Sequence, residues 1–338
     1  MDIVVTISDV ANKAKTSIAT VSRVLNNQTG YSEETRKKVL KVVDELGYEY
    51  NAIARSLKLN KTNTIGVIVP NISSMVTHDL LDGIEEASRA KGYSVIVSYT
   101  YSNAERKKKS LKTFKEQRVD GLLFVSDYLD DDDYVYLKNM GIPVVLVSTA
   151  SEKYPLPYVK TDDYDAAYGA VEFLISKGHQ EIGMLSGDAN DLISGITRLN
   201  GYKACLKDAD LLVEERKIAY GMNYSFDDGK NKLKELLESY PKMTALFVAS
   251  DEMAAGVIAA AHEMGMKIPE ELSVMGYDNI LISQMVWPAL TTVSQPLTEM
   301  GNKATDMVLR LINGETTDVE SIILPHAIIE RASVCQLS

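Results

Sequence analysis

Short runs of apolar, mostly β-branched residues alternate with helical segments along most of the chain, from Thr64 onward. The predicted strands are Ile65–Val69, Ser94–Ser98, Gly121–Ser126, Val144–Ser148, Ile182–Ser186, Ala245–Ala249 and Leu272–Met275. Near-continuous apolar strands separated by helices are typical of parallel sheets that helices cover on both faces. The alternation therefore predicts an α/β fold. So many strand–helix units favour two lobes, with a ligand cleft beyond the carboxyl ends of their strands.

The first 61 residues have a different pattern, of short helices with local start and stop signals. Thr6 and Asp9 form a capping box that predicts a first helix, and Ser17 predicts the start of a second. Ser32 predicts the start of a third helix, and Gly47 suits a left-handed cap at its end. Two short helices joined by so tight a turn indicate a helix-turn-helix, although a generic three-helix bundle would show the same caps.

The second helix presents small and polar groups and one guanidinium. These residues are Ser17, Ile18, Ala19, Thr20, Ser22 and Arg23. A helix of this kind fits the major groove of DNA, where the base edges are displayed. From these residues alone, DNA binding and a plain helical bundle are about equally favoured.

Charge is distributed unevenly between the two parts. The formal net charge of the whole chain is −11, which by itself argues against binding to nucleic acid. The first 61 residues, however, contain ten Lys and Arg against seven Asp and Glu, so they carry +3 and the remainder carries −14. An acidic body discourages unspecific contact with DNA and leaves binding to the basic head.

Composition and motifs exclude several classes of protein. There is no apolar run of transmembrane length, no secretory signal and no disulfide framework, since only Cys205 and Cys335 occur; we expect a cytoplasmic protein without a membrane partner. The four histidines lack metal-ligand spacing, and no catalytic or phosphate-cradling motif is found. We therefore expect no enzymatic activity, cofactor or metal. The charged runs Asp130–Asp133 and Arg106–Lys109 are expected to lie in solvent.

The N-terminal segment resembles the headpiece of LacI/GalR-type transcriptional regulators. The resemblance rests on Thr6–Ala11 with Ala14 and on Ser17–Asn26. The family usually has Gly-Val where this chain has Lys15-Thr16, which alters the turn and leaves the reading helix unchanged. By resemblance, Thr6, Asn26 and Tyr31 join the second helix as DNA contacts.

The next segment, Asn51–Lys58, resembles the hinge helix of the same family, and Asn51, Ala54 and Leu57 would contact DNA. By resemblance, Leu57 is the apolar wedge that enters the minor groove at the centre of the operator and bends the duplex. The alternative is a leucine in an interdomain linker. Tyr50 stands where the family often has Pro, which predicts a less rigid entry into the hinge.

The rest of the chain resembles the two-lobed, periplasmic-binding-protein-like core of that family, so the resemblance covers essentially the whole length. It rests on Ile65–Pro70, Arg198 with Gly201-Tyr202, Asp251–Gly256, Gly276–Asn279 and Pro288–Val293. The resemblance implies crossovers between the lobes. The expected parts are a helix-turn-helix DNA-binding headpiece at 1–49, a hinge helix and linker at 50–61, an N-terminal core lobe at 62–161 and 291–322, and a C-terminal core lobe at 162–290 and 323–338.

A binding cleft needs only a few convergent polar groups and an apolar or aromatic wall. By resemblance Arg198 grips the effector, and a guanidinium with the Asp278 carboxylate suits vicinal hydroxyls; the alternative for this pair is a salt bridge between the lobes. Asp251 is expected either to join them or to cap a helix, and Trp287 either to line the pocket or to pack elsewhere. The other expected lining residues are Met75, Val76, Ser148, Tyr224 and Ser250.

These observations predict a homodimeric DNA-binding transcriptional regulator, with repression of a carbohydrate-utilisation operon as the leading hypothesis. It would bind near-palindromic double-stranded operator DNA under allosteric control by a small-molecule effector, a sugar or sugar phosphate. Alternatives are a non-sugar metabolite or a phosphocarrier partner protein as the signal. A periplasmic-type sugar-binding protein is a further class, against which the headpiece and the missing signal count.

Overall fold

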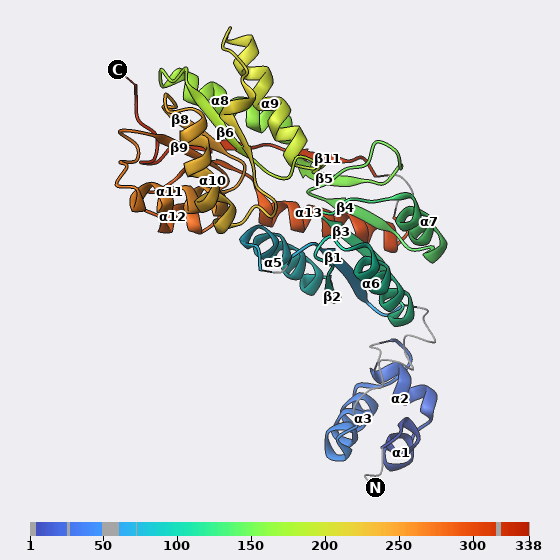
Figure 1. The fold of residues 1–338 in the computed structure, drawn as a ribbon. Coiled ribbons are helices and arrows are strands. Elements are labelled where there is room, and N and C mark those ends of the chain that lie inside the picture. The colour runs from blue at the N-terminus through green and yellow to red at the C-terminus, as the bar shows by residue number, and fades with distance from the viewer. Residues whose placement is uncertain (1–4, 26–27, 49–60, 72, 316–318, 338) are drawn as a thin grey trace. The chain divides into compact units, whose positions relative to one another are not determined.

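The chain divides into two units, the headpiece (Met1–Thr62) and the core (Asn63–Ser338) (Figure 1). The computed structural model describes residues 5–25, 28–48, 61–71, 73–315 and 319–337. No helix within these ranges is long and apolar enough to cross a membrane.

Three short helices surround a small apolar core in the headpiece. They are α1 (Ile7–Lys13), α2 (Ile18–Leu25) and α3 (Glu33–Leu46). The predicted capping box of Thr6 and Asp9 is present at α1, and Ser17 Oγ accepts the N–H of Thr20 at 3.1 Å at the start of α2. Gly47 ends α3 in the left-handed conformation with φ of 58°. The local signals for the ends of these helices are therefore confirmed.

The first lobe of the core is a six-stranded sheet in the order β11-β5-β4-β3-β1-β2, with every neighbouring pair parallel. Its strands are β1 (Thr64–Val69), β2 (Ser94–Tyr99), β3 (Gly121–Val125), β4 (Val144–Val147), β5 (Tyr158–Thr161) and β11 (Ile322–Leu324). The helices α5 (Met75–Ala90) and α13 (Leu297–Ile312) pack on one face, and α6 (Ala104–Gln117) and α7 (Asp131–Met140) on the other.

The second lobe is a six-stranded sheet in the order β12-β10-β9-β8-β6-β7. Its strands are β6 (Ile182–Ser186), β7 (Ile218–Tyr220), β8 (Ala245–Val248), β9 (Ser273–Asp278), β10 (Thr291–Ser294) and β12 (Ala327–Ile329), and only the edge strand β12 is antiparallel to its neighbour. The helices α8 (Asp163–Ser176) and α9 (Gly195–Asp208) cover one face, and α10 (Phe226–Ser239) and α11 (Asp251–Glu263) the other. The short elements η1 (Glu215–Lys217) and α12 (Ile282–Met285) complete the lobe.

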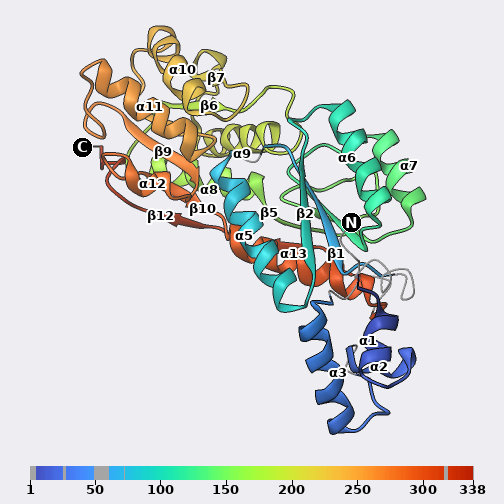
Figure 2. The same cartoon turned by 90° about the horizontal axis from the view of Figure 1, so that it is seen from below.

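The chain crosses between the lobes three times, after β5, after β10 and after β11. Figures 1 and 2 show the late helix α13 lying beside the early helix α5 in the first lobe. The expected assignment of 291–322 to the N-terminal lobe is wrong at its start, because β10 pairs with β9 in the second sheet. It is also wrong at its end, because β11 extends to Leu324 before the chain returns. Strand pairing, which decides both points, has no local signal in the sequence.

The carboxyl edges of the two sheets lie at these crossings. Thr161 ends β5 and Asp163 already begins α8, while Ser294 ends β10 and Leu297 begins α13. A helix that leads into the amino end of a parallel strand runs antiparallel to that strand. It therefore begins at the carboxyl edge of the sheet on which it packs. Each crossing therefore leaves one carboxyl edge and arrives at the other.

Two facing glycines allow α5 and α13 to pack closely. A Cβ on Gly83 would lie 2.0 Å from the carbonyl oxygen of Thr298, and a Cβ on Gly301 would lie 2.3 Å from that of Leu80. Only glycine fits at these positions, so the two helices meet backbone to backbone beneath the sheet.

The two charged runs expected in solvent are partly buried. Lys107 is only 5% exposed; its Nζ lies 2.7 Å from the Asp133 carboxylate and donates to the carbonyl of Tyr128 at 2.6 Å. Asp130 caps α7 with a capping box that includes Asp133. The expectation is therefore wrong for Lys107 and Asp133, which pair across α6 and α7, a contact that spacing along the sequence does not reveal.

Candidate functional site

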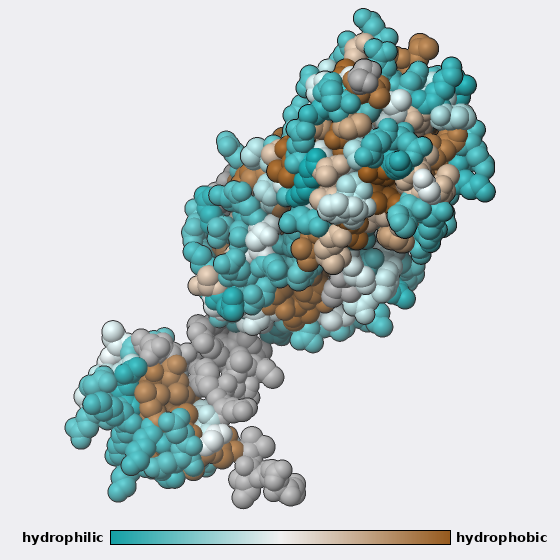
Figure 3. Space-filling view, turned by 90° about the vertical axis from the view of Figure 1, so that its left-hand side faces the viewer, coloured by the Kyte–Doolittle hydropathy of each residue, from teal (hydrophilic) through white to brown (hydrophobic). Residues whose placement is uncertain are grey.

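The helix α2 turns one side to the headpiece core and the other to solvent. Val21 and Val24 are 0% and 2% exposed, whereas Ile18 on the opposite side is 49% exposed. Ser17, Ala19 and Arg23 are also exposed, and Thr20 and Ser22 are half-buried. In the view of Figure 3 the headpiece surface is mainly hydrophilic around a hydrophobic patch. The solvent-facing side of α2 therefore carries most of the residues expected to read DNA.

The other expected DNA contacts fall into two groups. Thr6 is exposed, but its hydroxyl donates to Asp9 Oδ2 at 2.6 Å, and Tyr31 packs partly against the headpiece core. Asn26, Asn51, Ala54 and Leu57 lie outside the described residues.

The turn between α1 and α2 contains a left-handed residue that is not glycine. Lys15 has φ of 50°, at the position where the sequence departs from Gly-Val. The left-handed region costs an L-residue other than glycine about 1–2 kcal/mol. The turn therefore contains a left-handed conformation at Lys15 that has a cost in free energy.

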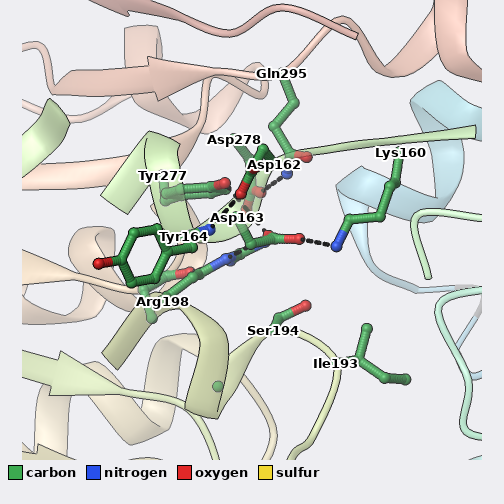
Figure 4. A network of polar contacts seen from close by, with 12 residues as sticks. Lys160, Asp162, Asp163, Tyr164, Ile193, Ser194, Arg198, Tyr277, Asp278 and Gln295 are labelled. Atoms are coloured by element: carbon green, nitrogen blue, oxygen red, sulfur yellow. Dashed lines mark hydrogen bonds and ion pairs between the residues drawn. The ribbon is translucent and has the colours of Figure 1, made fainter. Parts of the chain in front are cut away.

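In the core, Arg198 of α9 lies in a buried polar network (Figure 4). Its Nε donates to an Asp163 carboxylate oxygen at 3.0 Å, its Nη2 forms an ion pair with the same oxygen at 2.9 Å, and its Nη1 donates to the carbonyl of Ala249 at 2.6 Å. The guanidinium stacks on the ring of Tyr277, 3.7 Å from the centroid. Lys160, at the end of β5, contacts the other Asp163 oxygen at 3.3 Å. The network therefore links the last strand before the first crossing to the second lobe.

Asp278 ends β9 beside this network. It is 3% exposed and accepts a hydrogen bond from Gln295 Nε2 at 2.8 Å. Burial raises the pKa of Asp278 to about 7, against the opposing effects of Arg198 and of the bond from Gln295. The expected partners Arg198 and Asp278 thus lie in one electrostatic neighbourhood, but both belong to the second lobe. The alternative of a salt bridge between the lobes is wrong for this pair, since Arg198 binds Asp163 instead.

Backbone strain gathers after the carboxyl ends of strands. Of the eleven described non-glycine residues with positive φ, Ser126 follows β3, Ser148 follows β4, Tyr224 follows β7, and Asp278 and Asn279 lie at the end of β9. Asp278 has φ of 119°, a region that L-residues rarely adopt. Strain of this kind persists only where the surrounding structure enforces it, and it clusters at functional sites. This clustering supports a ligand site at the carboxyl edges of the sheets.

Asp251 and Trp287, two of the expected effector residues, differ sharply in burial. Asp251 is 0% exposed; one oxygen accepts from Thr292 Oγ1 at 2.6 Å and the other from the N–H of Ile280 at 2.9 Å. It therefore fixes the segments around β9 and β10, and the helix α11 is capped by Ser250 instead. Trp287 is 89% exposed, so it neither lines a buried pocket nor packs.

The remaining expected lining residues lie near the carboxyl edges. Met75 and Val76 are partly buried against the first-lobe core at the start of α5, and Ser148 follows β4. The Tyr224 hydroxyl donates to Asp191 Oδ2 at 2.5 Å, and Ser250 Oγ donates to the carbonyl of Tyr224 at 3.3 Å. Polar groups from the segments before α9, before α11 and after β7 are thus joined in the second lobe.

Two family models match the chain. Residues 62–332 match the model described as periplasmic binding proteins and sugar binding domain of the LacI family, and residues 6–51 match bacterial regulatory proteins of the lacI family. The chain belongs to the LacI family. It is a DNA-binding transcriptional regulator and not an enzyme, and regulators of this family are dimeric and bind small-molecule effectors.

This LacI-family regulator is similar to known proteins over almost its whole length. It is 39% identical to catabolite control protein A of Priestia megaterium, over 97% of this chain and 99% of that protein. It is 29% identical to the lac repressor dimer bound to operator and the anti-inducer ONPF, with a TM-score of 0.88 over 98% and 99% of the two chains. The complex of the transcriptional regulator CelR with cellobiose is 28% identical, with a TM-score of 0.75 over 97% and 99%.

The sequence did not point to several residues that the structure places at this candidate site. They are Lys160, Asp163, Tyr277, Gln295 and Glu252, the last of which accepts the N–H of Met75 at 3.0 Å. Asp163 lies 35 positions from Arg198 and reads locally as a helix-start residue, so only the fold brings the two together. Among the described residues, no group of His, Cys, Asp and Glu is placed to hold a metal ion.

Proposed function

We propose that this LacI-family regulator represses a carbohydrate-utilisation operon and that a sugar or sugar phosphate, bound between the carboxyl edges of the two sheets, controls its affinity for the operator. The observation that carries the proposal is Arg198, held by Asp163 and Ala249 with its guanidinium on Tyr277. The guanidinium has five N–H groups, and the hydrogen bonds to Asp163 and Ala249 use two of them. A fixed guanidinium next to the Asp278 carboxylate suits vicinal hydroxyls, which both donate and accept.

The family description and one similar structure agree with a carbohydrate. The matched core model is described as a sugar binding domain, and the CelR complex contains cellobiose. The wall formed by Met75 and Val76 at the start of α5 would contact the less polar face of such a ligand.

On the DNA side, two protomers would place one α2 each in the major groove of a near-palindromic operator. The exposed side of α2, with Ser17, Ile18, Ala19 and Arg23, supports this reading. The hinge segment that contains Leu57 would insert at the centre and bend the duplex. Effector binding would change the arrangement of the lobes and thereby the distance between the two hinges. DNA and effector must then alter each other's affinity by the same factor.

Binding to the upstream region of the chain's own gene, followed by fluorescence anisotropy with and without sugars and sugar phosphates, tests this function. We expect R198K to keep operator affinity and to lose the effector response, because lysine retains the charge and loses the planar fork. R216K changes an exposed arginine in the same lobe and should respond like the wild type. A full response in R198K would refute the assignment of Arg198, and a response to purines or to a phosphocarrier alone would refute the carbohydrate.

The wedge has its own test. We expect L57A to weaken operator binding at least tenfold and to reduce the bend of the DNA, which a gel-shift with circularly permuted fragments measures. Unchanged affinity and bend would refute the role of Leu57.

A further inference from the structure

One hydrogen bond in the core joins the two lobes at their carboxyl edges. The Oε1 atom of Glu252, on the first turn of α11 in the second lobe, accepts the N–H of Met75, the first residue of α5 in the first lobe, at 3.0 Å. Ser74 precedes α5 but makes no side-chain capping bond. The capping group of α5 is therefore a carboxylate supplied by the other lobe.

This carboxylate occupies the place where an anionic ligand would bind. The N-terminus of a helix attracts anions because its first N–H groups have no acceptor within the helix and its dipole is positive there. At α5 the first N–H is taken by Glu252, and at α11 the hydroxyl of Ser250 accepts the N–H of Met253 at 3.2 Å. A phosphate at either helix start would therefore meet a side-chain oxygen that already accepts one of the first N–H groups, and at α5 this oxygen belongs to a carboxylate.

The charges around Arg198 are also unfavourable for an anion. The guanidinium is already paired with Asp163, and the only other described cation in the network is Lys160, which contacts the same carboxylate. Against these two cations stand five carboxyl groups, those of Asp163, Asp191, Asp251, Glu252 and Asp278. Burial raises the pKa of Asp278, and the charges of Asp163 and Glu252 add to this rise. Burial raises the pKa of Asp251 and of Asp278, which reduces their negative charge, but Asp163, Asp191 and Glu252 still outnumber the two cations.

We propose that Glu252 is a specificity-determining residue that restricts the effector to uncharged ligands by filling the anion position at the start of α5. The inference rests on the proposed function, because it concerns the same effector site. Of the two proposed ligand classes, sugars and sugar phosphates, the inference selects the unphosphorylated sugars. A neutral polyol meets acceptors in the acidic groups and donors in Arg198, whereas a phosphate ester meets a carboxylate where it would need an N–H group.

Titration calorimetry of the full-length chain with matched pairs tests the proposal: glucose against glucose 6-phosphate, fructose against fructose 6-phosphate, and cellobiose as a neutral disaccharide. We expect the neutral sugar of a responding pair to bind the wild type at least tenfold more tightly than its phosphate ester. E252Q keeps an oxygen that can accept the Met75 N–H and removes only the charge. We expect E252Q to reduce the ratio of the affinities for the neutral sugar and its phosphate ester about tenfold, which corresponds to about 1.4 kcal/mol.

A matched control is E263Q, on the exposed end of the same helix, where Glu263 pairs with Lys230. It changes the net charge equally and should leave the preference unchanged; circular dichroism would show that both variants are folded. A phosphate ester that binds the wild type more tightly than its parent sugar would overturn the proposal. An equal preference of E252Q and E263Q for the neutral sugar over its ester would also overturn it. In both cases the carbohydrate function would stand. If no member of any pair bound and operator binding were intact, the carbohydrate function would fall, and this inference with it.

Discussion

Replacement of Asp163 by Asn would show how strongly the core depends on the network at the first crossing. Asp163 faces two cations, with Arg198 on one oxygen and Lys160 on the other, and also accepts a bond from the Tyr277 hydroxyl at 3.3 Å. The side chains of Asp163 and Arg198 are each only 6% exposed. D163N keeps the size and one acceptor oxygen but leaves a buried guanidinium without its counter-charge.

The magnitude follows from this burial. Removal of one partner of a buried ion pair costs about 3–5 kcal/mol, because the remaining charge stays desolvated. The retained amide oxygen preserves part of the hydrogen bonding to Arg198, so we expect the lower end, about 3 kcal/mol less free energy of unfolding. Effector binding should weaken as well, since Asp163 holds the guanidinium over Tyr277.

Urea unfolding followed by circular dichroism measures the change. The control is E235Q, which breaks the exposed pair of Lys232 and Glu235, whose side chains are 35% and 64% exposed; exposed pairs contribute about 0–1 kcal/mol. A loss in D163N no larger than that in E235Q would refute the reasoning, because the buried pair would then act like a surface one.

Three further predictions concern single residues. Since burial raises the pKa of Asp278 to about 7, its contribution to folding stability is lost as the pH rises from 3.8 through about 7. Urea unfolding should therefore show a larger fall in the free energy of unfolding between pH 5 and pH 8 in the wild type than in D278N. Equal falls in the two proteins would contradict this prediction. K15G should slow amide hydrogen exchange in α1 and α2 by relieving about 1–2 kcal/mol of backbone strain, less the entropy cost of glycine, whereas K15A, which keeps the Cβ atom, should not. W287A should change the unfolding free energy by no more than about 0.5 kcal/mol, because the side chain is 89% exposed; a larger loss in chemical denaturation would contradict this.

The parts of the fold that local chemistry determines were predictable. Thr6, Ser17 and Gly47 act on groups within a few residues of themselves, so the ends of the headpiece helices follow from the sequence. Long β-branched runs such as β1 were also found. Short strands such as β5 and β7 were missed, because three or four residues with polar members give no clear period.

The site was predictable only in part, because its partners come from distant segments. From the sequence we predict that Arg198 and Asp278 act as a pair. In the structure Arg198 binds Asp163, and Asp278 accepts a hydrogen bond from Gln295. The exposure of Trp287 was missed for a similar reason: an aromatic side chain favours burial in general, and only the fold decides which segment supplies the cover.

The crossings between the lobes also affect how the chain folds while it is being synthesised. The strand β11 completes the first sheet beside β5, but 161 positions separate Thr161 from Ile322. At about 5–20 residues per second, a ribosome needs roughly 8–32 seconds to make that stretch. During this interval β5 has an uncovered edge, and the sheet lacks the helix α13. The elongating chain therefore exposes a strand edge that the finished protein covers, and an unpaired strand edge of this kind favours aggregation during synthesis.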